Sequence, residues 1–310
     1  MSKVSIIHCP DYDRDAVNIA IRRHFDNLGS LQNFISKGDT VLIKPNLICP
    51  KPTTQPAQTD PAVICETARI VIEAGARVIV ADSPAWSNTH NCLKALNIDK
   101  ELLDMGVKIT DLDQPVAVTL PFTSLKASVS RVALEADKII NLPKLKAHQQ
   151  MGATIAVKNM FGAVPGKRKA LWHYRQGESP STFAAMLLGV YELLKPAISI
   201  VDAVVAMEGQ GPINGTPKYI GLLLASTDAI ACEAVCAKVL GLDEDALPVV
   251  KAAIKLYPDR IDLGNIEIIG DDYREYICHD FLHAKQTPLK FTLPRICKSV
   301  FKQVVILMKR

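Results

Sequence analysis

The sequence of 310 residues lacks the features that define several large classes of protein. Its 16 glycines and 19 prolines follow no period, which excludes a collagen-like chain or an array of linkers. None of its eight cysteines forms a CxxC pair, so zinc-ribbon and ferredoxin patterns are absent from the sequence. No stretch reaches about 18 apolar residues without a charge, and an acidic residue as early as Asp11 argues against a signal peptide. We therefore expect reduced thiols and a cytoplasmic protein.

Two common nucleotide motifs are missing as well. The sequence holds neither the GxxxxGK[ST] loop nor the GxGxxG dinucleotide fingerprint. Aromatic residues make up only 5% and do not alternate with basic ones in the way that single-stranded nucleic acids require. We expect no nucleic-acid partner.

The charge is unevenly distributed along the chain. Lys and Arg number 36 against 32 Asp and Glu, a net charge of +4. Residues 281–310 contain seven basic residues and no acidic one, which leaves 29 − 32 = −3 for residues 1–280. The body is slightly acidic, whereas the C-terminal segment is strongly cationic.

Short β-branched runs alternate with helical patterns, which predicts an α/β fold with mostly parallel sheets and helices on both faces. The expected strands are 4–9, 41–47, 76–84, 107–112, 136–145, 197–207, 219–227 and 266–271. Helices are expected from residue 16 to 28 and from about 60 to 74, with Asp60 before an N1 proline. We predict two lobes with a site between them: an N-terminal lobe (1–195), a second α/β unit (196–280) and a cationic tail (281–310).

Polar residues gather where these strands end, the edge at which open α/β sheets bind ligands. The predicted ligand- or cofactor-binding residues are Lys44, Asn46, Asp82, Ser83, Lys144, Lys146, Thr154, Asn159, Glu208, Gly209 and Gly211.

The densest group lies between Lys144 and His173, which contains six Lys or Arg, two His and no carboxylate. Cations without internal partners repel one another unless an anion neutralises them, so this segment predicts a pocket for a phosphate, a carboxylate or a nucleotide-type cofactor. A solvated basic loop is the alternative. His148, Lys158 and His173 are the predicted catalytic residues, since histidine titrates near neutral pH and desolvation turns a lysine into a base or nucleophile.

A metal is a further possibility for this pocket, with His173, His148 and Asp202 as its predicted ligands. Glu208 lies in a glycine- and proline-rich loop, where capping a neighbouring helix is the structural alternative. Asp228 is expected to cap a helix rather than to bind a ligand, and Cys232 and Cys236 to be buried on one helix face.

Several segments together resemble the domain-of-unknown-function family numbered 362, over about residues 40–243. They are VLIKPN, VADSP, NLPKLKAH with the following KNMFGAVPG, and VDAVVAMEGQGP with ASTDAIA. The resemblance implies an α/β fold with a pocket lined by these motifs, but no settled activity. Many members carry an added iron–sulfur module, which this cysteine pattern does not match.

A shorter stretch is similar to part of the lactate racemase catalytic subunit. That resemblance implies that Lys158 anchors a nickel-pincer nucleotide, that His148 is the acid or base, and that His173 is a metal ligand. The racemase's other His-Arg motif and its glycine-rich run before the lysine have no counterpart here.

Residues 285–310 interleave basic and apolar side chains, and from Ile296 onward the spacing suits a basic amphipathic helix. Such a helix packs on the body of the protein, binds a protein partner, or lies on an anionic membrane surface.

The leading functional hypothesis is an enzyme acting on or with an anionic small molecule or nucleotide-type cofactor, with metal-dependent proton or hydride transfer as one form. A racemase, an isomerase or an oxidoreductase would each fit. The alternative is a non-catalytic cofactor carrier or redox-partner module that uses the same pocket. A divalent metal or a phosphate-bearing group is the expected cofactor. The sequence leaves the substrate and the oligomeric state open.

Overall fold

The computed structural model describes the chain except residues 86, 124, 166–179, 244–245 and 286–310. The predictions made for His173 and for the tail from residue 286 onward therefore lie outside the described residues.

The described strands form one large sheet and one small one. Their bounds are β1 Ser2–His8, β2 Thr40–Pro45, β3 Arg77–Asp82, β4 Lys108–Asp111, β5 Pro115–Thr119, β6 Lys126–Ser130, β7 Lys138–Leu142, β8 Lys144–His148, β9 Gly152–Thr154, β10 Ile198–Glu208, β11 Thr216–Ser226 and β12 Ile266–Gly270. The large sheet runs in the order β12-β1-β11-β10-β7-β2-β3-β4, with β8 attached to β10 and β9 to β8; β5 and β6 form a separate hairpin.

Parallel pairing dominates this sheet. Strands β10, β7, β2, β3 and β4 pair in parallel, so their carboxyl ends share one edge. Strand β11 is antiparallel to both β10 and β1. Strand β10 extends beyond the end of β7. Strand β8 pairs with the part of β10 that lies past that end.

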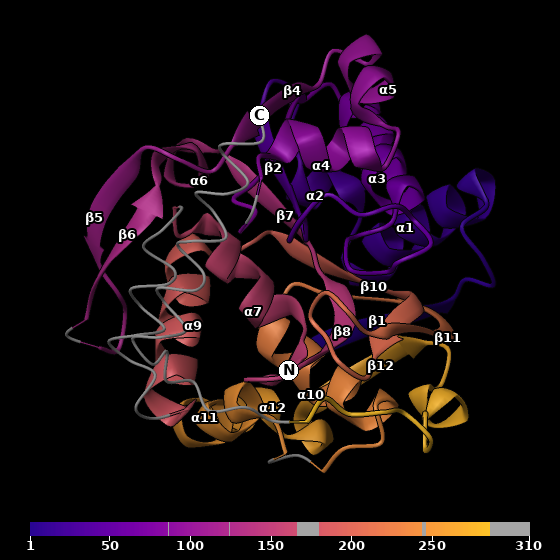
Figure 1. The fold of residues 1–310 in the computed structure, drawn as a ribbon, viewed down its shortest axis with the longest axis vertical. Helices are drawn as coiled ribbons and strands as arrows, with labels where there is room; N and C mark the ends of the chain where they lie inside the picture. Colours follow the sequence, from indigo (N-terminus) through magenta and orange to yellow (C-terminus); the bar gives the residue numbers. More distant parts are fainter. Residues whose placement is uncertain (86, 124, 166–179, 244–245, 286–310) are drawn as a thin grey trace.

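The helices cover both faces of the sheet, as Figure 1 shows. Their bounds are α1 Arg14–Leu28, α2 Leu31–Phe34, α3 Pro61–Glu73, α4 Thr89–Ala95, α5 Asp99–Asp104, α6 Arg131–Glu135, α7 Ala156–Asn159, α9 Pro180–Leu194, α10 Ala229–Val239, α11 Pro248–Leu256 and α12 Pro258–Ile261. Short 3-10 turns cover Met160–Ala163, Leu263–Asn265 and Tyr273–Tyr276.

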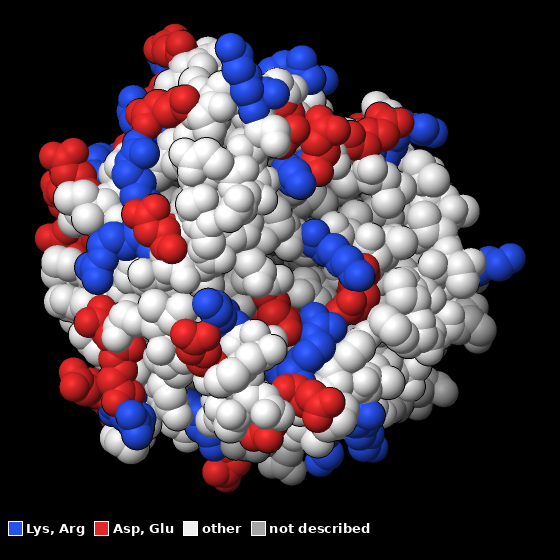
Figure 2. Space-filling model, turned by 180° about the vertical axis from the view of Figure 1, so that it is seen from behind, with Lys and Arg blue, Asp and Glu red and all other residues white. Residues whose placement is uncertain are grey.

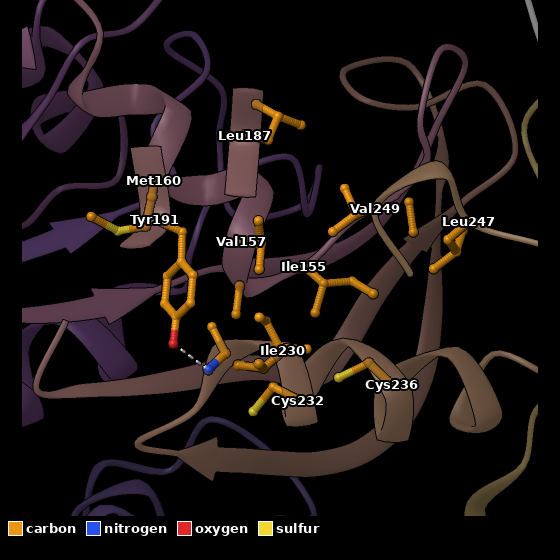
Figure 3. Close-up of a cluster of buried hydrophobic side chains, with 14 of the residues drawn as sticks. Ile155, Val157, Met160, Leu187, Tyr191, Ile230, Cys232, Cys236, Leu247 and Val249 are labelled. Carbon is orange, nitrogen blue, oxygen red and sulfur yellow. Dashed lines mark hydrogen bonds between the residues drawn. The ribbon is translucent and has the colours of Figure 1, made fainter. Parts of the chain in front are cut away.

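Two apolar cores follow from this layering. One joins α1, α3 and α4 to the sheet, and the other joins α7, α9, α10 and α11 to the opposite face. Figure 3 shows Cys232 and Cys236 of α10 among the apolar side chains of the second core, which confirms that they are buried on one helix. The hydroxyl of Tyr191 accepts a hydrogen bond from the Ala229 amide at the start of α10.

The predicted fold class is confirmed: the molecule is α/β with a mostly parallel sheet. All eight expected strands are present, but Pro143 splits the run 136–145 into β7 and the start of β8. The hairpin β5–β6 was not predicted, because both strands are short and polar residues interrupt the apolar ones in β6. Strands from both predicted lobes share the large sheet, and the boundary at residue 195 stays a prediction.

Among the described helices, none is both long enough and apolar enough to cross a bilayer.

Candidate functional site

Strand β8 carries the central side chains of the site. Because side chains alternate along a strand, Lys144, Lys146 and His148 project from one face and Leu145 and Ala147 from the other. Both lysines are about 1% exposed, and His148 is buried. The predicted cluster at this strand therefore exists, and it lies inside the molecule.

Lys44 and Asp82 form a buried ion pair at the shared edge of β2 and β3. The Lys44 Nζ lies 2.9 Å from Asp82 Oδ1, and the Leu47 amide donates to Asp82 Oδ2 at 2.8 Å. A Cβ atom at Gly162 would stand 2.3 Å from Asp82 Oδ1 and 2.5 Å from the Lys44 Nζ, so only glycine allows this approach. Burial lowers the pKa of Lys44, and the carboxylate of Asp82 offsets part of that effect.

Three asparagines extend this pair into a buried polar network. Asn159 Oδ1 accepts from the Lys44 Nζ at 3.3 Å and from Asn46 Nδ2 at 2.7 Å. Asn159 Nδ2 donates to Asn141 Oδ1 at 2.8 Å, and Asn141 in turn donates to the Ala156 carbonyl. The amides hold α7 against the ends of β2 and β7.

Lys144 has a complete set of partners. Its Nζ donates to Asp202 Oδ2 at 2.8 Å and to the Tyr12 hydroxyl at 2.7 Å. Tyr12 donates to Asp202 Oδ1 at 2.7 Å and accepts from the Val205 amide. Asp202 also accepts from the Asp60 amide at 2.9 Å. Each oxygen of this fully buried carboxylate is therefore occupied by the protein itself.

Lys146 has hydrogen bonds but no carboxylate partner. Its Nζ donates to Asn46 Oδ1 at 2.6 Å and to the Ala57 carbonyl at 2.5 Å, and it makes no ion pair with any described residue. Burial and the nearby charge of Lys158 lower the pKa of Lys146 to about 7. Thr154 pairs directly across from it in β9, and the buried hydroxyl of Thr154 has no hydrogen-bond partner among the described residues.

Lys158 lies on α7 and is partly buried. Within the described residues it makes neither a hydrogen bond nor an ion pair, and burial with the charge of Lys44 lowers its pKa to about 8. Glu233 of α10 attracts it electrostatically, but that carboxyl accepts from the Val157 amide at 2.8 Å, and burial raises its pKa to about 8. Glu233 therefore acts on Lys158 through its charge but forms no ion pair with it.

The His148 ring is held by backbone amides of the turn that directly follows it. Its Nδ1 accepts from the Gln150 amide at 3.1 Å and the Met151 amide at 3.3 Å, so the neutral ring carries its proton on Nε2. Asp202 pairs with the other end of β8, four residues from His148, or about 13 Å along a strand. The structure thus does not bring these two predicted metal ligands together. No group of three potential ligand side chains occurs in the described part of the chain.

The remaining predicted residues lie around the margin of the lysine cluster on β8. Ser83 directly follows β3 and is partly buried. Glu208 accepts from the Leu282 amide at 2.9 Å. Gly209 has a φ of +75°, and a Cβ atom at Gly211 would lie 1.9 Å from the Ala147 carbonyl oxygen, so this loop presses on β8. Asp228 caps α10 by accepting from the Ile230 amide, which confirms its structural role.

Several further residues belong to the site and were not predicted from the sequence. Asn141 and Glu233 were detectable as single polar residues within apolar runs of a strand and a helix. Tyr12 gave no signal, because it lies in an acidic loop about 190 residues from Asp202 in sequence. Asp60 was predicted only as a helix cap, and it does cap α3; burial and Asp202 also raise its pKa to about 6.

One solved structure agrees with this architecture. The structure of the lactate racemase apoprotein from Thermoanaerobacterium thermosaccharolyticum superposes with a TM-score of 0.50 at 13% identity, over 78% of this chain and 57% of that one. At that identity the likeness shows the fold alone, and the racemase roles of Lys158, His148 and His173 stay predictions. A Thermotoga maritima protein, a structural genomics target, matches with a TM-score of 0.42 at 12% identity, over 72% of this chain and 57% of that one.

Sequence relatives assign the family. The thylakoid-associated protein sll1697 of Synechocystis sp. is 34% identical over 99% of this chain and 95% of its own length. The model of the domain of unknown function DUF362 matches residues 41–238. The chain therefore belongs to the DUF362 family.

Proposed function

We propose that the protein is an enzyme that binds an anionic, phosphate-bearing small molecule at Lys146 and Lys158 and moves a proton with its lysine and histidine side chains. One observation carries this proposal: the charge of Lys158 acts on the buried Lys146, and neither lysine makes an ion pair with a described residue.

The charges of the cluster do not balance. Lys44 and Lys144 are matched by Asp82 and Asp202 at 2.9 and 2.8 Å. Lys146 and Lys158 have no such partners among the described residues, and an uncompensated ammonium is costly where it is buried, as that of Lys146 is. An anion between them would supply the missing charge, and the unpartnered Thr154 hydroxyl beside Lys146 offers it a further hydrogen bond.

The same surroundings suit proton transfer. With a pKa of about 7, Lys146 is present as both amine and ammonium at neutral pH, so it accepts or donates a proton at little cost. His148 projects from the same face of β8 and presents its Nε2–H as a donor, because its Nδ1 is occupied by backbone amides. We assign the anion to the lysines and the proton transfer to Lys146 and His148.

Titration of the purified protein with sulfate and with pyrophosphate in an isothermal calorimeter tests the site. Lys158→Met is the best variant, because Lys158 makes no hydrogen bond with a described residue whose loss would disturb the fold. We expect its affinity for pyrophosphate to fall by about ten-fold or more, as removal of one charge-assisted contact implies. Lys100→Met, on an exposed position of α5, is the matched control.

Equal affinities in wild type and Lys158→Met would contradict the proposal. Native mass spectrometry of the unmodified protein separates the enzyme from the alternative of a carrier. A stoichiometric bound molecule that Lys158→Met removes, without turnover of any phosphate ester offered, would favour storage or delivery of a cofactor over catalysis.

We also propose that residues 285–310 bring the protein to an anionic membrane surface. The segment has seven basic residues and no acidic one, interleaved with apolar residues, and the relative from Synechocystis sp. is described as thylakoid-associated. Basic amphipathic segments bind such surfaces through apolar burial together with attraction to anionic lipid.

Sedimentation with liposomes tests this second proposal. The full chain should sediment with vesicles that contain anionic lipid and be released by high salt, and a chain ending at residue 284 should stay in solution. Binding that survives this deletion would overturn the proposal.

A further inference from the structure

The tip of the hairpin β5–β6 carries an exposed aromatic side chain. Phe122 lies between the two strands and is 62% exposed to solvent. Its backbone has a φ of +60°, in the left-handed region that bulky side chains rarely adopt. An apolar ring in water and a strained backbone are both unfavourable for folding, and such strain is concentrated at functional positions.

The Phe122 ring is held in place by its neighbours. It packs edge-to-face on the ring of Tyr257, with 5.3 Å between the centroids, and the guanidinium of Arg260 lies 4.8 Å from the same Tyr257 ring. A Cβ atom at Gly189 of α9 would lie 3.1 Å from Leu120 Cβ, so the hairpin lies close against that helix. Figure 1 shows the hairpin beside α9, with α11 at the lower end of α9. The tip is therefore a fixed projection of the folded body.

Basic and apolar side chains surround this projection. Lys251, Ile254 and Lys255 are exposed and three or four residues apart, so they form one stripe along α11, the helix that ends directly before the Tyr257 platform. Leu256 is 43% exposed at the end of α11, and Lys126 is exposed at the start of β6. In Figure 2 the side on which β5–β6 lies, at the right, is largely uncharged, with basic side chains at its edge.

The small apolar area and the lysines favour a lipid surface over a protein partner. The exposed side chains of Phe122, Ile254 and Leu256 fall well short of the about 800 Å² per partner that a stable protein interface buries. Lysine is depleted at protein interfaces, whereas anionic headgroups attract it. A projecting aromatic ring between lysines matches the boundary between headgroups and acyl chains.

We propose that the tip of β5–β6 and the exposed stripe of α11 are a docking surface for an anionic membrane, with Phe122 inserted at the acyl chains. Lys126, Lys251 and Lys255 lie at the headgroups. The inference rests on the membrane contact proposed for residues 285–310, and it adds the part of the folded body that meets the same surface. Insertion removes the Phe122 ring from water, which offsets the cost of exposing it in the free protein.

Quenching of tryptophan fluorescence by brominated lipid tests this surface on the full chain. The vesicles contain phosphatidylglycerol and phosphatidylcholine brominated on its acyl chains. Phe122→Trp keeps an aromatic ring against Tyr257 and should add emission, above that of Trp86 and Trp172 in wild type, that brominated lipid quenches and plain lipid does not. Leu103→Trp is the matched control, because Leu103 is 50% exposed on α5, away from the hairpin in Figure 1, and the emission it adds should not be quenched.

A second variant measures the contribution of the ring to affinity. Asparagine tolerates a positive φ, so Phe122→Asn should unfold at the temperature of wild type. Its affinity for the anionic vesicles, measured by sedimentation, should fall by about ten-fold, as loss of a partly buried phenyl ring implies. Leu103→Asn should leave that affinity unchanged.

The outcomes separate this surface from the C-terminal segment. Sedimentation of the full chain without quenching in Phe122→Trp would overturn the docking surface and leave the contact of residues 285–310 standing. A full chain that does not sediment with anionic vesicles would overturn both proposals. Self-association in light scattering that Phe122→Asn abolishes would assign the surface to a second copy of the chain and also overturn the inference.

Discussion

Lys144 and Lys146 stand two residues apart on the same face of β8, and both are about 1% exposed, yet their electrostatic surroundings are opposite. Lys144 contacts a carboxylate, Asp202, that is itself held by a tyrosine and a backbone amide. Lys146 contacts one amide oxygen and one carbonyl oxygen, and the charge that shifts its pKa most is that of another cation, Lys158.

Under the proposed function, this difference separates a lysine with a structural role, Lys144, from one that binds the anion, Lys146. A buried ion pair with all its hydrogen bonds satisfied holds β8, β10 and the segment around Tyr12 in register, and it leaves no charge for a ligand. A buried ammonium without a counter-charge is unfavourable for folding and is retained where a ligand supplies the counter-charge. Two lysines of equal burial therefore differ in what their removal should do.

The largest effect is expected from Asp202→Asn. Loss of the carboxylate charge leaves Lys144 buried without a counter-charge and weakens the contacts of Tyr12 and the Asp60 amide. Breaking a buried pair in this way costs about 3–5 kcal/mol, and urea denaturation should show that decrease in the free energy of unfolding.

Glu135→Gln is the matched control, because it breaks the exposed pair of Arg131 and Glu135 at 3.3 Å. Exposed pairs contribute about 0–1 kcal/mol, so its effect should be small. An Asp202→Asn variant as stable as this control would show that Lys144 is not held by its pair.

The fold was predictable from the sequence because its strands are continuous apolar runs bounded by breakers. The runs that became β2, β3 and β10 have nearly the predicted limits. Periodicity carries no information on the pairing of strands far apart in sequence. The extension of β10 beyond β7, which makes room for β8, therefore had to come from the structure.

The sequence predicted which residue types form the site, but not which lysine forms an ion pair with which carboxylate. The excess of cations between Lys144 and Lys158 was visible in the sequence. The choice of Lys144 and not Lys146 as the partner of Asp202 depends on strand register and on Tyr12, a residue from the other end of the chain. Sequence alone therefore could not show which of the two lysines has a carboxylate partner.

The second prediction is a gain in the free energy of unfolding, whereas the first is a loss. Lys158→Met removes a cation that makes no ion pair with a described residue, so the free energy of unfolding should rise by about 1–2 kcal/mol in a buffer free of sulfate and phosphate. Urea denaturation measures this change, with the exposed Lys100→Met as control. Added sulfate should stabilise the wild type more than the variant. A destabilised variant would place Lys158 with Lys144 among the structural lysines.

The smallest effect is the pH dependence of sulfate binding. Sulfate keeps its charge above pH 6, so any change reports on the protein. The pKa values of Lys146 and Lys158 are lowered to about 7 and about 8, so both are ammonium at pH 6, and the affinity should already have fallen by about ten-fold when the pH has risen to 8.

Without sulfate, the free energy of unfolding should rise with pH, whereas the sulfate affinity falls. In the unfolded chain the pKa of lysine is about 10.5, so between pH 7 and that value the unfolded state binds more protons than the folded state. The lysines therefore contribute a free energy of unfolding that rises with pH from about 7, and saturating sulfate, which restores their ammonium forms, should remove that rise. Lys158→Met should keep one step, that of Lys146, and move it to higher pH, because the charge of Lys158 no longer lowers the pKa of Lys146. A sulfate affinity that is flat from pH 6 to 9 in calorimetry would mean that neither lysine holds the anion.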